Sequence, residues 1–282
     1  FVTLLFGVNK GNASRWIMGF QPSDLAKLIL VIYVARMLVH KKEVIKDFKL
    51  GIAPILWPIV IICGLILPAD FSTAAMLFIV CFIMLFVGGA KLKHLSAMIG
   101  VSIAGFAILI LLNLAFPGLL PRVDTWQKRI TSFESGSQKE NYQAEMAKRA
   151  VANGFLFGKG PGKGHVKNDL YSAQSDFIYA SSIEEFGSIF GGLGLVIMYT
   201  ILFFRSIRIM NKTESLFGAY VVFGLSFLLV FQSLINMGVG VNLFPVTGQP
   251  LPLISMGGTS IIFSCVALGI IINVSRTVYK DA

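Results

Sequence analysis

Three carboxylates lie close together in one short stretch of the chain, QSDFIYASSIEEFG, which runs from Gln174 to Gly187. They are Asp176, Glu184 and Glu185, and a long apolar segment follows them directly. If the stretch is helical, Asp176 and Glu184 share one face, roughly 12 Å apart. Carboxylates are suited to general acid–base chemistry, and an ionised group at membrane depth is costly enough to mark a functional site. The stretch therefore offers three candidate groups, which the residues alone do not rank.

Two of these acids have a structural alternative. Ser181 and Ser182 precede Glu184 and Glu185 by three residues each, which is the spacing of a helix capping box. Glu184 and Glu185 are therefore predicted either to line a polar cavity or to cap a helix. The same choice holds for Asp70, which precedes another apolar run and has Thr73 nearby as a capping partner.

The composition identifies the class of protein that must position these groups. Hydrophobic residues make up 55% of the 282 residues and charged residues only 13%, and the mean hydropathy is +0.77. These values predict an all-α polytopic membrane protein. Cys63, Cys81 and Cys265 lie inside apolar runs without paired spacing, and the three histidines form no ligand cluster, so the sequence indicates no metal site.

Apolar runs of suitable length predict seven transmembrane helices. Their ranges are 23–39, 51–67, 73–89, 95–116, 177–204, 216–237 and 258–275. The chain begins at Phe1 inside a further apolar run that is too short to cross a bilayer. We therefore expect this chain to be the later part, 1–282, of one integral membrane domain whose first spans are missing.

Lysine and arginine residues are concentrated in alternate short loops, which predicts the orientation. The basic loops hold Arg36, Lys41, Lys42, Lys46, Lys49, Lys91, Lys93, Arg205, Arg208, Lys212, Arg276 and Lys280. The short connections 68–72 and 238–255 hold none. The positive-inside rule makes the basic side cytoplasmic and places Asp176 on the extracytoplasmic side. The net charge of +10 is partly this topology signal, and no nucleic-acid-binding module is visible.

A polar segment, GNASRWIMGFQPSDLAK, leads into the first span on the extracytoplasmic side. Ser23 or Asp24 is predicted to cap that helix. Arg15 offers a bidentate donor for phosphate, and Trp16 is either a ring for a sugar face or an aromatic of the membrane interface. Lys27, one turn into the span, either extends outward or faces a polar cavity.

The longest predicted loop, 117–175, is also extracytoplasmic and contains the run GKGPGKG from Gly158 to Gly164. This run is not a phosphate-binding loop of the nucleotide type, because Gly164 stands where serine or threonine is required. We predict a flexible or tightly turned lid in which Lys159 and Lys163 meet anionic groups. The length of the loop is itself typical of a functional segment.

A second special loop, 236–257, separates the last two spans. Pro245, Pro250 and Pro252 exclude a continuous helix there, and several glycines permit tight turns. Irregular backbone this apolar is tolerated near a membrane when it is buried in protein or lines a cavity. We therefore expect this loop to be extracytoplasmic or re-entrant and to approach the site; an ordinary linker is the alternative.

The motifs GNASRW, FQPSDLAK, QSDFIYA, EEFG and NLFPVTGQPLPLISMGGTS, taken together and in this order, resemble the SEDS family of FtsW, RodA and SpoVE, the peptidoglycan glycan-strand polymerases. QSDFIYA with EEFG is more similar to the division branch, FtsW, than to the elongation branch. Family members have about ten spans, which implies roughly three before Phe1. Two motifs depart from the family pattern: residues 67–73 keep Asp70 but lack the usual Gln and Gly, and YSAQSD keeps Asp176 but lacks a neighbouring His.

The resemblance implies a reaction. The substrates would be lipid II molecules, a disaccharide-pentapeptide on undecaprenyl pyrophosphate, joined by β-1,4 transfer during septal wall synthesis. Asp176 would be the catalytic base, with a raised pKa. Arg15, Lys27 and loop lysines such as Lys159 would meet the pyrophosphate, and Trp16, Asp70, Glu184 and Glu185 would line the substrate site.

The resemblance also implies a setting. The protein would lie in the bacterial cytoplasmic membrane, with a class B penicillin-binding protein and other divisome proteins as partners and with no evident cofactor. Whether a divalent cation assists the pyrophosphate is left open. The alternatives are a flippase or transporter of lipid-linked precursors, a RodA-like elongation polymerase, and a scaffold that recruits a synthase.

Overall fold

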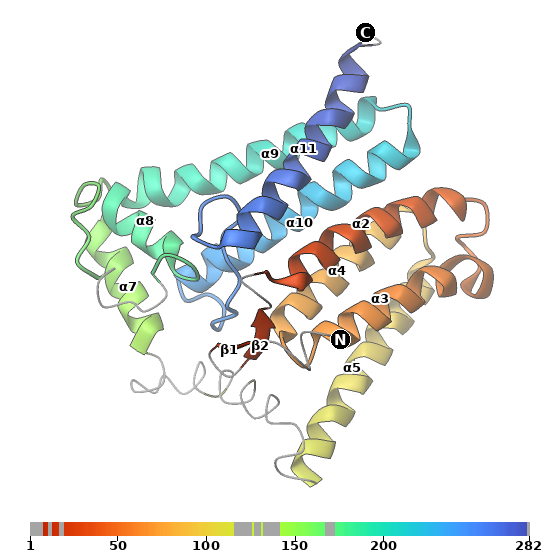
Figure 1. The fold of residues 1–282 in the computed structure, drawn as a ribbon, viewed down its shortest axis with the longest axis horizontal. Coiled ribbons are helices and arrows are strands. Elements are labelled where there is room, and N and C mark those ends of the chain that lie inside the picture. Colours follow the sequence, from red (N-terminus) through yellow and green to blue (C-terminus); the bar gives the residue numbers. More distant parts are fainter. Residues whose placement is uncertain are drawn as a thin grey trace.

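The computed structural model describes residues 8–10, 13–16, 20–115, 126, 131, 142–166 and 173–280. Its long elements are all helical, which confirms the predicted all-α membrane class (Figure 1). Six of the predicted spans each coincide with a helix, whereas the predicted span 177–204 is divided at Gly187, where a φ angle of +79° bends the chain sharply. A short antiparallel hairpin, β1 (Val8–Lys10) and β2 (Ala13–Trp16), precedes the first described helix. The helices at the predicted spans are α2 (Pro22–His40), α3 (Ala53–Ile66), α4 (Phe71–Val87), α5 (Leu92–Ala115), α8 (Ile178–Gly187), the π-helical η3 (Ser188–Leu193) that leads directly into α9 (Gly194–Lys212), α10 (Leu216–Gly240) and α11 (Gly258–Lys280).

Among the described residues, five helical segments are long and apolar enough to cross a membrane: Phe48–Ile66, Leu92–Ala115, Ile178–Lys212, Leu216–Gly240 and Gly258–Val278. The first of them joins a π-helical turn, η1 (Phe48–Ile52), to α3. Helix α4 is apolar but shorter, with 17 residues. Helix α2 has the length of a span but carries Asp24, Lys27 and Arg36. Helices suit a membrane because every backbone hydrogen bond is made within the helical segment.

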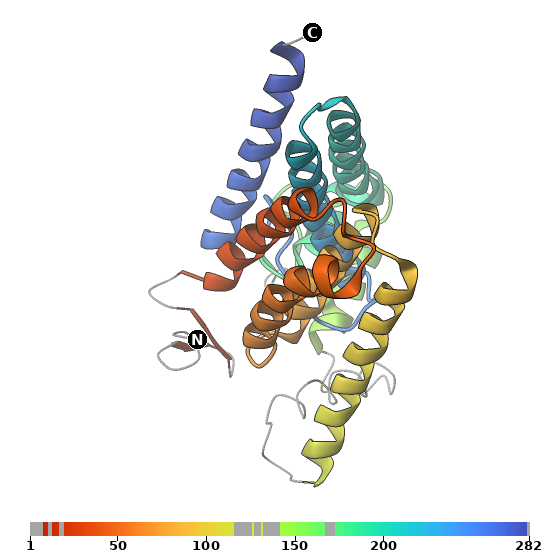
Figure 2. The ribbon, with the colours of Figure 1, turned by 90° about the vertical axis from the view of Figure 1, so that its right-hand side faces the viewer.

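Helix α10 is the centre of the bundle. In its most apolar stretch 67% of the residues are buried, compared with 11–28% in the other four candidate spans. It packs against α2, α4, α9 and α11, and the two views of the ribbon show it surrounded by these helices (Figures 1 and 2). The main core cluster includes Val31 of α2, Leu77 of α4 and Leu225 of α10 itself. Both ends of α10 are therefore well placed to orient the loops attached to them.

The described part of the long loop 117–175 includes α7 (Tyr142–Gly154), which packs against α8. The contact is close because Gly154 has no side chain: a Cβ there would lie 2.0 Å from the Ile183 carbonyl oxygen. In Figure 1 these two helices lie together at the end of the bundle where α9 begins. Helix α7 is therefore held by tertiary contacts and not by the chain connection alone.

The helix starts differ from the prediction in one case and agree in another. Neither Ser23 nor Asp24 caps α2: its N-cap residue is Gln21, which makes no side-chain capping bond, and Asp24 lies inside the helix. Asp70, in contrast, does cap α4, because its carboxylate accepts a hydrogen bond from the Thr73 amide at 3.1 Å. The capping prediction for α2 failed because Asp24 has a stronger partner, described below.

Candidate active site

Asp176 lies in a turn, residues 173–177, immediately before α8 begins at Ile178. The expectation that Asp176 and Glu184 share one helical face is therefore wrong, since only Glu184 is in the helix. The Asp176 side chain is partly exposed, whereas the next residue, Phe177, is fully buried. This pair explains the local geometry: the buried ring fixes the turn and leaves the carboxylate at the surface of the protein.

Three successive carbonyl oxygens fix the backbone of this turn. The Gln174 oxygen accepts from the Met256 amide at 2.8 Å, and the Ser175 oxygen accepts from the Ser255 hydroxyl at 2.6 Å. The Asp176 oxygen accepts from the Asn236 side-chain amide at 3.0 Å. All three donors belong to α10 or to the proline-rich segment after it. The loop 236–257 thus lies against the candidate base and orients it.

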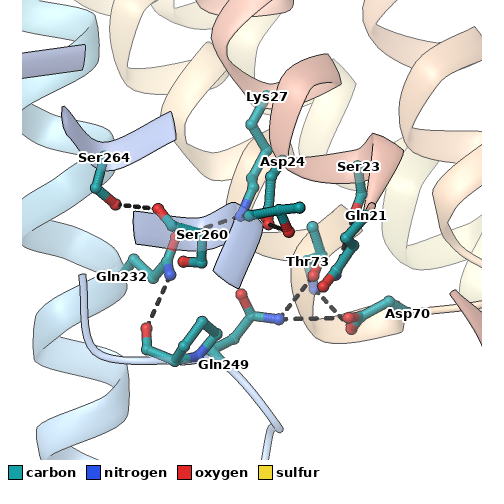
Figure 3. A network of polar contacts seen from close by, with 12 residues as sticks. Gln21, Ser23, Asp24, Lys27, Asp70, Thr73, Gln232, Gln249, Ser260 and Ser264 are labelled. Atoms are coloured by element: carbon teal, nitrogen blue, oxygen red, sulfur yellow. Dashed lines mark hydrogen bonds and ion pairs between the residues drawn. The ribbon is translucent and has the colours of Figure 1, made fainter. Parts of the chain in front are cut away.

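Asn236 and Gln249 extend this anchor into the bundle. The Asn236 amide also donates to the Gln249 carbonyl oxygen at 2.7 Å. The Gln249 side chain donates to the Thr73 hydroxyl at 2.6 Å and to the Asp70 carboxylate at 3.5 Å (Figure 3). Asp70 is 4% exposed. The capping reading of Asp70 is therefore confirmed, and its carboxylate also contacts a buried polar cluster through Gln249.

Lys27 points into the same part of the protein. Its ammonium lies 2.7 Å from the Asp24 carboxylate, with the two residues 5% and 4% exposed, and also donates to Gln232 Oε1 at 3.4 Å. Gln232 in turn donates to the Pro250 carbonyl oxygen at 2.8 Å, and Thr259 donates to Asp24 at 3.3 Å (Figure 3). Of the two readings of Lys27, the one in which it faces a polar interior is confirmed.

A small cavity adjoins this buried ion pair. It has a volume of about 20 Å³, which is room for one water molecule, and Asp24, Lys27 and Gln232 line it. A larger pocket of about 860 Å³ opens at the basic end of the bundle, between α2, α10 and α11. None of the predicted site residues lines that larger pocket. The larger pocket is therefore separate from the candidate site.

Glu184 is the centre of a second cluster and is fully buried. Its carboxylate accepts from the backbone amides of His165 and Val166 at 3.2 Å, and Lys159 Nζ lies 3.5 Å away. Glu185 accepts from the Gly162 amide at 3.1 Å. The capping-box alternative is therefore wrong, because neither acid lies at a helix start and both bind the GKGPGKG loop.

The GKGPGKG loop is tightly turned, as predicted. Gly158, Gly160 and Gly162 have φ angles of +77°, +100° and +77°, which side-chain-bearing residues rarely adopt. The amides of Lys159 and Gly160 donate to the carbonyl oxygens of Glu184 and Glu185, both at 2.9 Å. The anionic group that Lys159 meets in the folded chain is thus the Glu184 carboxylate.

Replacing Glu184 by Gln is expected to loosen this loop. The substitution removes the charge that strengthens the hydrogen bonds from His165 and Val166, and a bond to a charged group contributes about 1.5–3 kcal/mol. We expect hydrogen exchange at those two amides to be about 10- to 100-fold faster. Lys159→Met is the matched control: its ammonium is one-third exposed and 3.5 Å away, so it should have a much smaller effect. Unchanged exchange in Glu184→Gln would mean that the carboxylate does not hold the loop.

The predicted site residues therefore fall into separate groups. Asp176, Asp70 and Lys27 belong to one connected network, whose links are made by Asn236, Gln232 and the residues Gln249 and Pro250. Lys159, Glu184 and Glu185 form the loop cluster beside α7. Arg15 and Trp16 belong to strand β2, and their side chains lie outside the described part of the structure.

The residues that link the first network were not predicted. Gln232 and Asn236 stand four residues apart inside the otherwise apolar α10, and both are buried. Polar side chains one turn apart within a membrane helix are a signal of a common polar partner. That signal was available in the sequence. Ser255 and Gln249 carried no comparable signal, because their partners are distant in the chain.

The whole chain matches one family. The model of the FtsW/RodA/SpoVE family, described as cell cycle protein, matches residues 1–280. The chain is 33% identical to the stage V sporulation protein E of Bacillus subtilis, over 96% of this chain and 73% of that protein. It is 35% identical to the probable peptidoglycan glycosyltransferase FtsW of Geobacter metallireducens, over 98% of this chain and 72% of that protein.

Solved structures show the same fold. A chain from a structure of a peptidoglycan synthase complex, described as coordinating polymerization and crosslinking, aligns with a TM-score of 0.75 at 25% identity, covering 99% of this chain and 77% of that one. The rod shape determining protein RodA of Thermus thermophilus aligns with a TM-score of 0.67 at 24% identity, covering 99% and 74%. This chain is therefore a multi-pass integral membrane protein that belongs to the FtsW/RodA/SpoVE family.

Proposed function

We propose that this chain is the catalytic membrane part of a peptidoglycan glycosyltransferase of the division type, which joins lipid II units into glycan strands. Family membership and the relatives named peptidoglycan glycosyltransferase FtsW support this assignment. The observation that carries it is the turn at Asp176: three hydrogen bonds fix its backbone while its carboxylate stays partly exposed. A fixed, accessible carboxylate is what general-base chemistry requires.

In the proposed reaction, Asp176 takes the proton from the 4-hydroxyl group of the acceptor's GlcNAc. The hydroxyl oxygen attacks C1 of the donor's MurNAc, the bond from C1 to the pyrophosphate breaks, and a β-1,4 bond forms with inversion. Undecaprenyl pyrophosphate leaves with the bonding electrons. The charge that develops on the pyrophosphate must be met by cations.

The structure changes the assignment of those cations. Lys27 is buried and paired with Asp24, so we assign it to the polar network under the base and not to the leaving group. Lys159 and Arg15 remain proposed pyrophosphate contacts, and Lys163, exposed on the same loop, joins them. Trp16 is retained as a proposed contact to a sugar face. Glu184 and Glu185 act by holding the loop that carries the two lysines.

The proposed setting is the bacterial cytoplasmic membrane, with the catalytic end outside. The basic residues of α9, Arg205, Arg208 and Lys212, lie at its far end from α8 and Asp176 (Figure 1). The positive-inside rule supports a cytoplasmic position for that end. A class B penicillin-binding protein and other divisome proteins are the proposed partners. The synthase complex among the structural relatives supports a partnership of this kind.

The proposal is tested with purified full-length protein, fluorescent lipid II and liposomes that contain the lipid in both leaflets. We expect glycan strands to appear on a gel, with the partner transpeptidase present where the chain requires it. The same liposomes report movement of lipid II between leaflets through the accessibility of its fluorophore to an impermeant quencher. Repeating the reaction with a chelator tests whether a divalent cation assists the pyrophosphate.

Two outcomes contradict the proposal. Movement of lipid II between leaflets without any polymer would show that the chain is a transporter, and the buried charges of α2 would then belong to its transport path. Neither movement nor polymer, with the partner active only when this chain is bound, would make the chain a scaffold.

A further inference from the structure

An exposed apolar patch lies where the outer loop meets the start of α9. The segment after α7, Phe155–Phe157, carries two rings that are 75% and 72% exposed, with Leu156 between them. Phe186 and Phe190, on α8 and η3, are exposed as well. We call these five residues the aromatic foot. Aromatic side chains exposed in this number indicate a surface that something apolar covers.

The backbone of the foot is fixed to the helix beside it. The amides of Ser188 and Ile189 donate to the carbonyl oxygens of Phe155 and Leu156 at 2.8 and 3.3 Å. The Ser188 hydroxyl also donates to the Phe155 oxygen, at 2.6 Å. Phe155 has a φ angle of +45°, a conformation that costs a side-chain-bearing residue about 1–3 kcal/mol. The two outward rings are thus presented by a rigid segment and are not the ends of a loose loop.

Bilayer thickness places the foot at the outer boundary of the hydrocarbon region. The chain bends sharply at Gly187, and the helix that follows, η3 with α9, runs from Ser188 to Lys212 and reaches its first basic residue, Arg205, near the proposed cytoplasmic end. A hydrocarbon core about 30 Å thick spans about 20 helical residues at 1.5 Å each. Counting back from Arg205 to Ser188, where this helix begins, gives a rise of about 26 Å. The residues bonded to the foot, Ser188 and Ile189, therefore lie just inside the outer boundary.

The exposed apolar face of this helix is continuous with the foot. Every third or fourth residue along it is a large exposed hydrophobic: Phe190, Leu193, Ile197, Ile201 and Phe204. This spacing forms a stripe on one helical face, which in a membrane faces lipid. Phe190 belongs both to this stripe and to the aromatic foot, and the other foot residues lie beside its outer end. The foot is therefore continuous with a surface that the bilayer covers.

Two further features fit a lipid environment. Irregular backbone is tolerated at that depth only when its polar groups are bonded. The Lys159 and Gly160 amides donate to the carbonyl oxygens of Glu184 and Glu185, and the Gly158 amide donates to that of Gly154. Just beyond the foot stand Lys159, one-third exposed, and Lys163, which is exposed, at the level of lipid phosphates. Aromatic rings with basic residues outside them are the usual composition of a membrane interface.

We propose that the aromatic foot inserts into the outer leaflet and anchors α7 and the GKGPGKG loop to the membrane surface. The occupant is lipid: acyl chains cover the rings of Phe155 and Phe157, while the loop lysines meet phosphate groups. The foot would keep the extracytoplasmic loop at the depth where any lipid-linked sugar has its phosphate. Insertion of the foot into the membrane does not depend on the proposed reaction, and the experiment that tests it measures depth in the bilayer and not enzymatic activity.

The test measures depth with a spin label on the full-length protein in nanodiscs of phosphatidylethanolamine and phosphatidylglycerol. Cys63, Cys81 and Cys265 are replaced by serine, and single cysteines are introduced as Phe157→Cys and Phe155→Cys. Ile197→Cys, on the exposed stripe of α9 and outside the foot, is the lipid-exposed control, and Lys163→Cys, only a few residues along the same loop, is the matched polar control. Relaxation by oxygen, which concentrates in the hydrocarbon, is compared with relaxation by a water-soluble nickel chelate.

We expect labels at 155 and 157 to resemble the label at 197, with oxygen as the stronger relaxing agent, while the label at 163 shows the reverse. A variant that has lost its fold is recognised by its elution as an aggregate, and agreement between two positions guards against a local disturbance. If the labels at 155 and 157 instead respond like 163, the foot lies in water. That result overturns the proposal and assigns the patch to a protein partner on the extracytoplasmic side.

Discussion

Replacing Asp176 by Asn is expected to lower glycan-strand synthesis by about 10²- to 10⁴-fold, the usual contribution of a general base. The substitution keeps the size of the side chain but removes its capacity to take a proton. It should leave the fold intact, because the bonds that anchor residues 174–176 use their backbone oxygens. Polymer length and yield on a gel, together with the unfolding midpoint in detergent, measure the two effects separately.

Glu145→Gln is the matched control for this experiment. Glu145 is also an acid of the long loop 117–175, but it is on α7 and forms an exposed ion pair with Arg149. Its loss should leave polymerisation close to that of the wild type. An Asp176→Asn variant as active as the Glu145→Gln variant would place the base elsewhere in the protein.

Replacing Lys27 by Met is expected to have the largest effect on stability. The change leaves the Asp24 carboxylate buried without its cation, and removal of one partner of a buried pair typically costs about 3–5 kcal/mol. The Thr259 hydroxyl, at 3.3 Å, remains as a neutral donor and only partly compensates. Thermal unfolding in detergent should show a clear drop in the midpoint temperature.

The double variant Asp24→Leu with Lys27→Met separates charge from packing. It replaces both partners by apolar groups, so most of the lost stability should return. Arg149→Met, which breaks an exposed ion pair of the same kind on α7, should change the midpoint little. A double variant that is less stable than Lys27→Met alone would show that the two charges act independently and not as a pair.

The membrane helices were predictable because their signal is local. Apolar runs of span length identify a helix wherever they occur, and each of the seven predicted ranges contains one. The tight turn of the GKGPGKG loop was predictable for the same reason, since glycine tolerates positive φ at any position. The cap at Asp70 was one of two readings of a local pattern, and its bond to Thr73 is made within one turn of the chain.

The failures have a common physical cause, which is the competition of distant partners with local ones. Asp24 could have capped α2, but Lys27 and Thr259 bind it more favourably inside the bundle. Glu184 matched a capping box, yet its carboxylate binds amides about twenty residues earlier in the chain, His165 and Val166. No spacing rule contains such contacts, because they exist only after the helices have packed.

A single turn of α10 holds both halves of the polar network. Gln232 binds Lys27 and the Pro250 carbonyl, and Asn236, one turn further, binds the carbonyls of Asp176 and Gln249. A continuous path of hydrogen bonds and one peptide bond therefore joins the ion pair to the backbone of Asp176, and we expect the two sites to be coupled. Linkage is reciprocal: a molecule that rearranges one site changes the affinity of the other by the same factor. A compound that binds beside α2 is therefore expected to inhibit glycan-strand synthesis without contacting the substrate's sugars. Its affinity is expected to change when substrate is bound at Asp176.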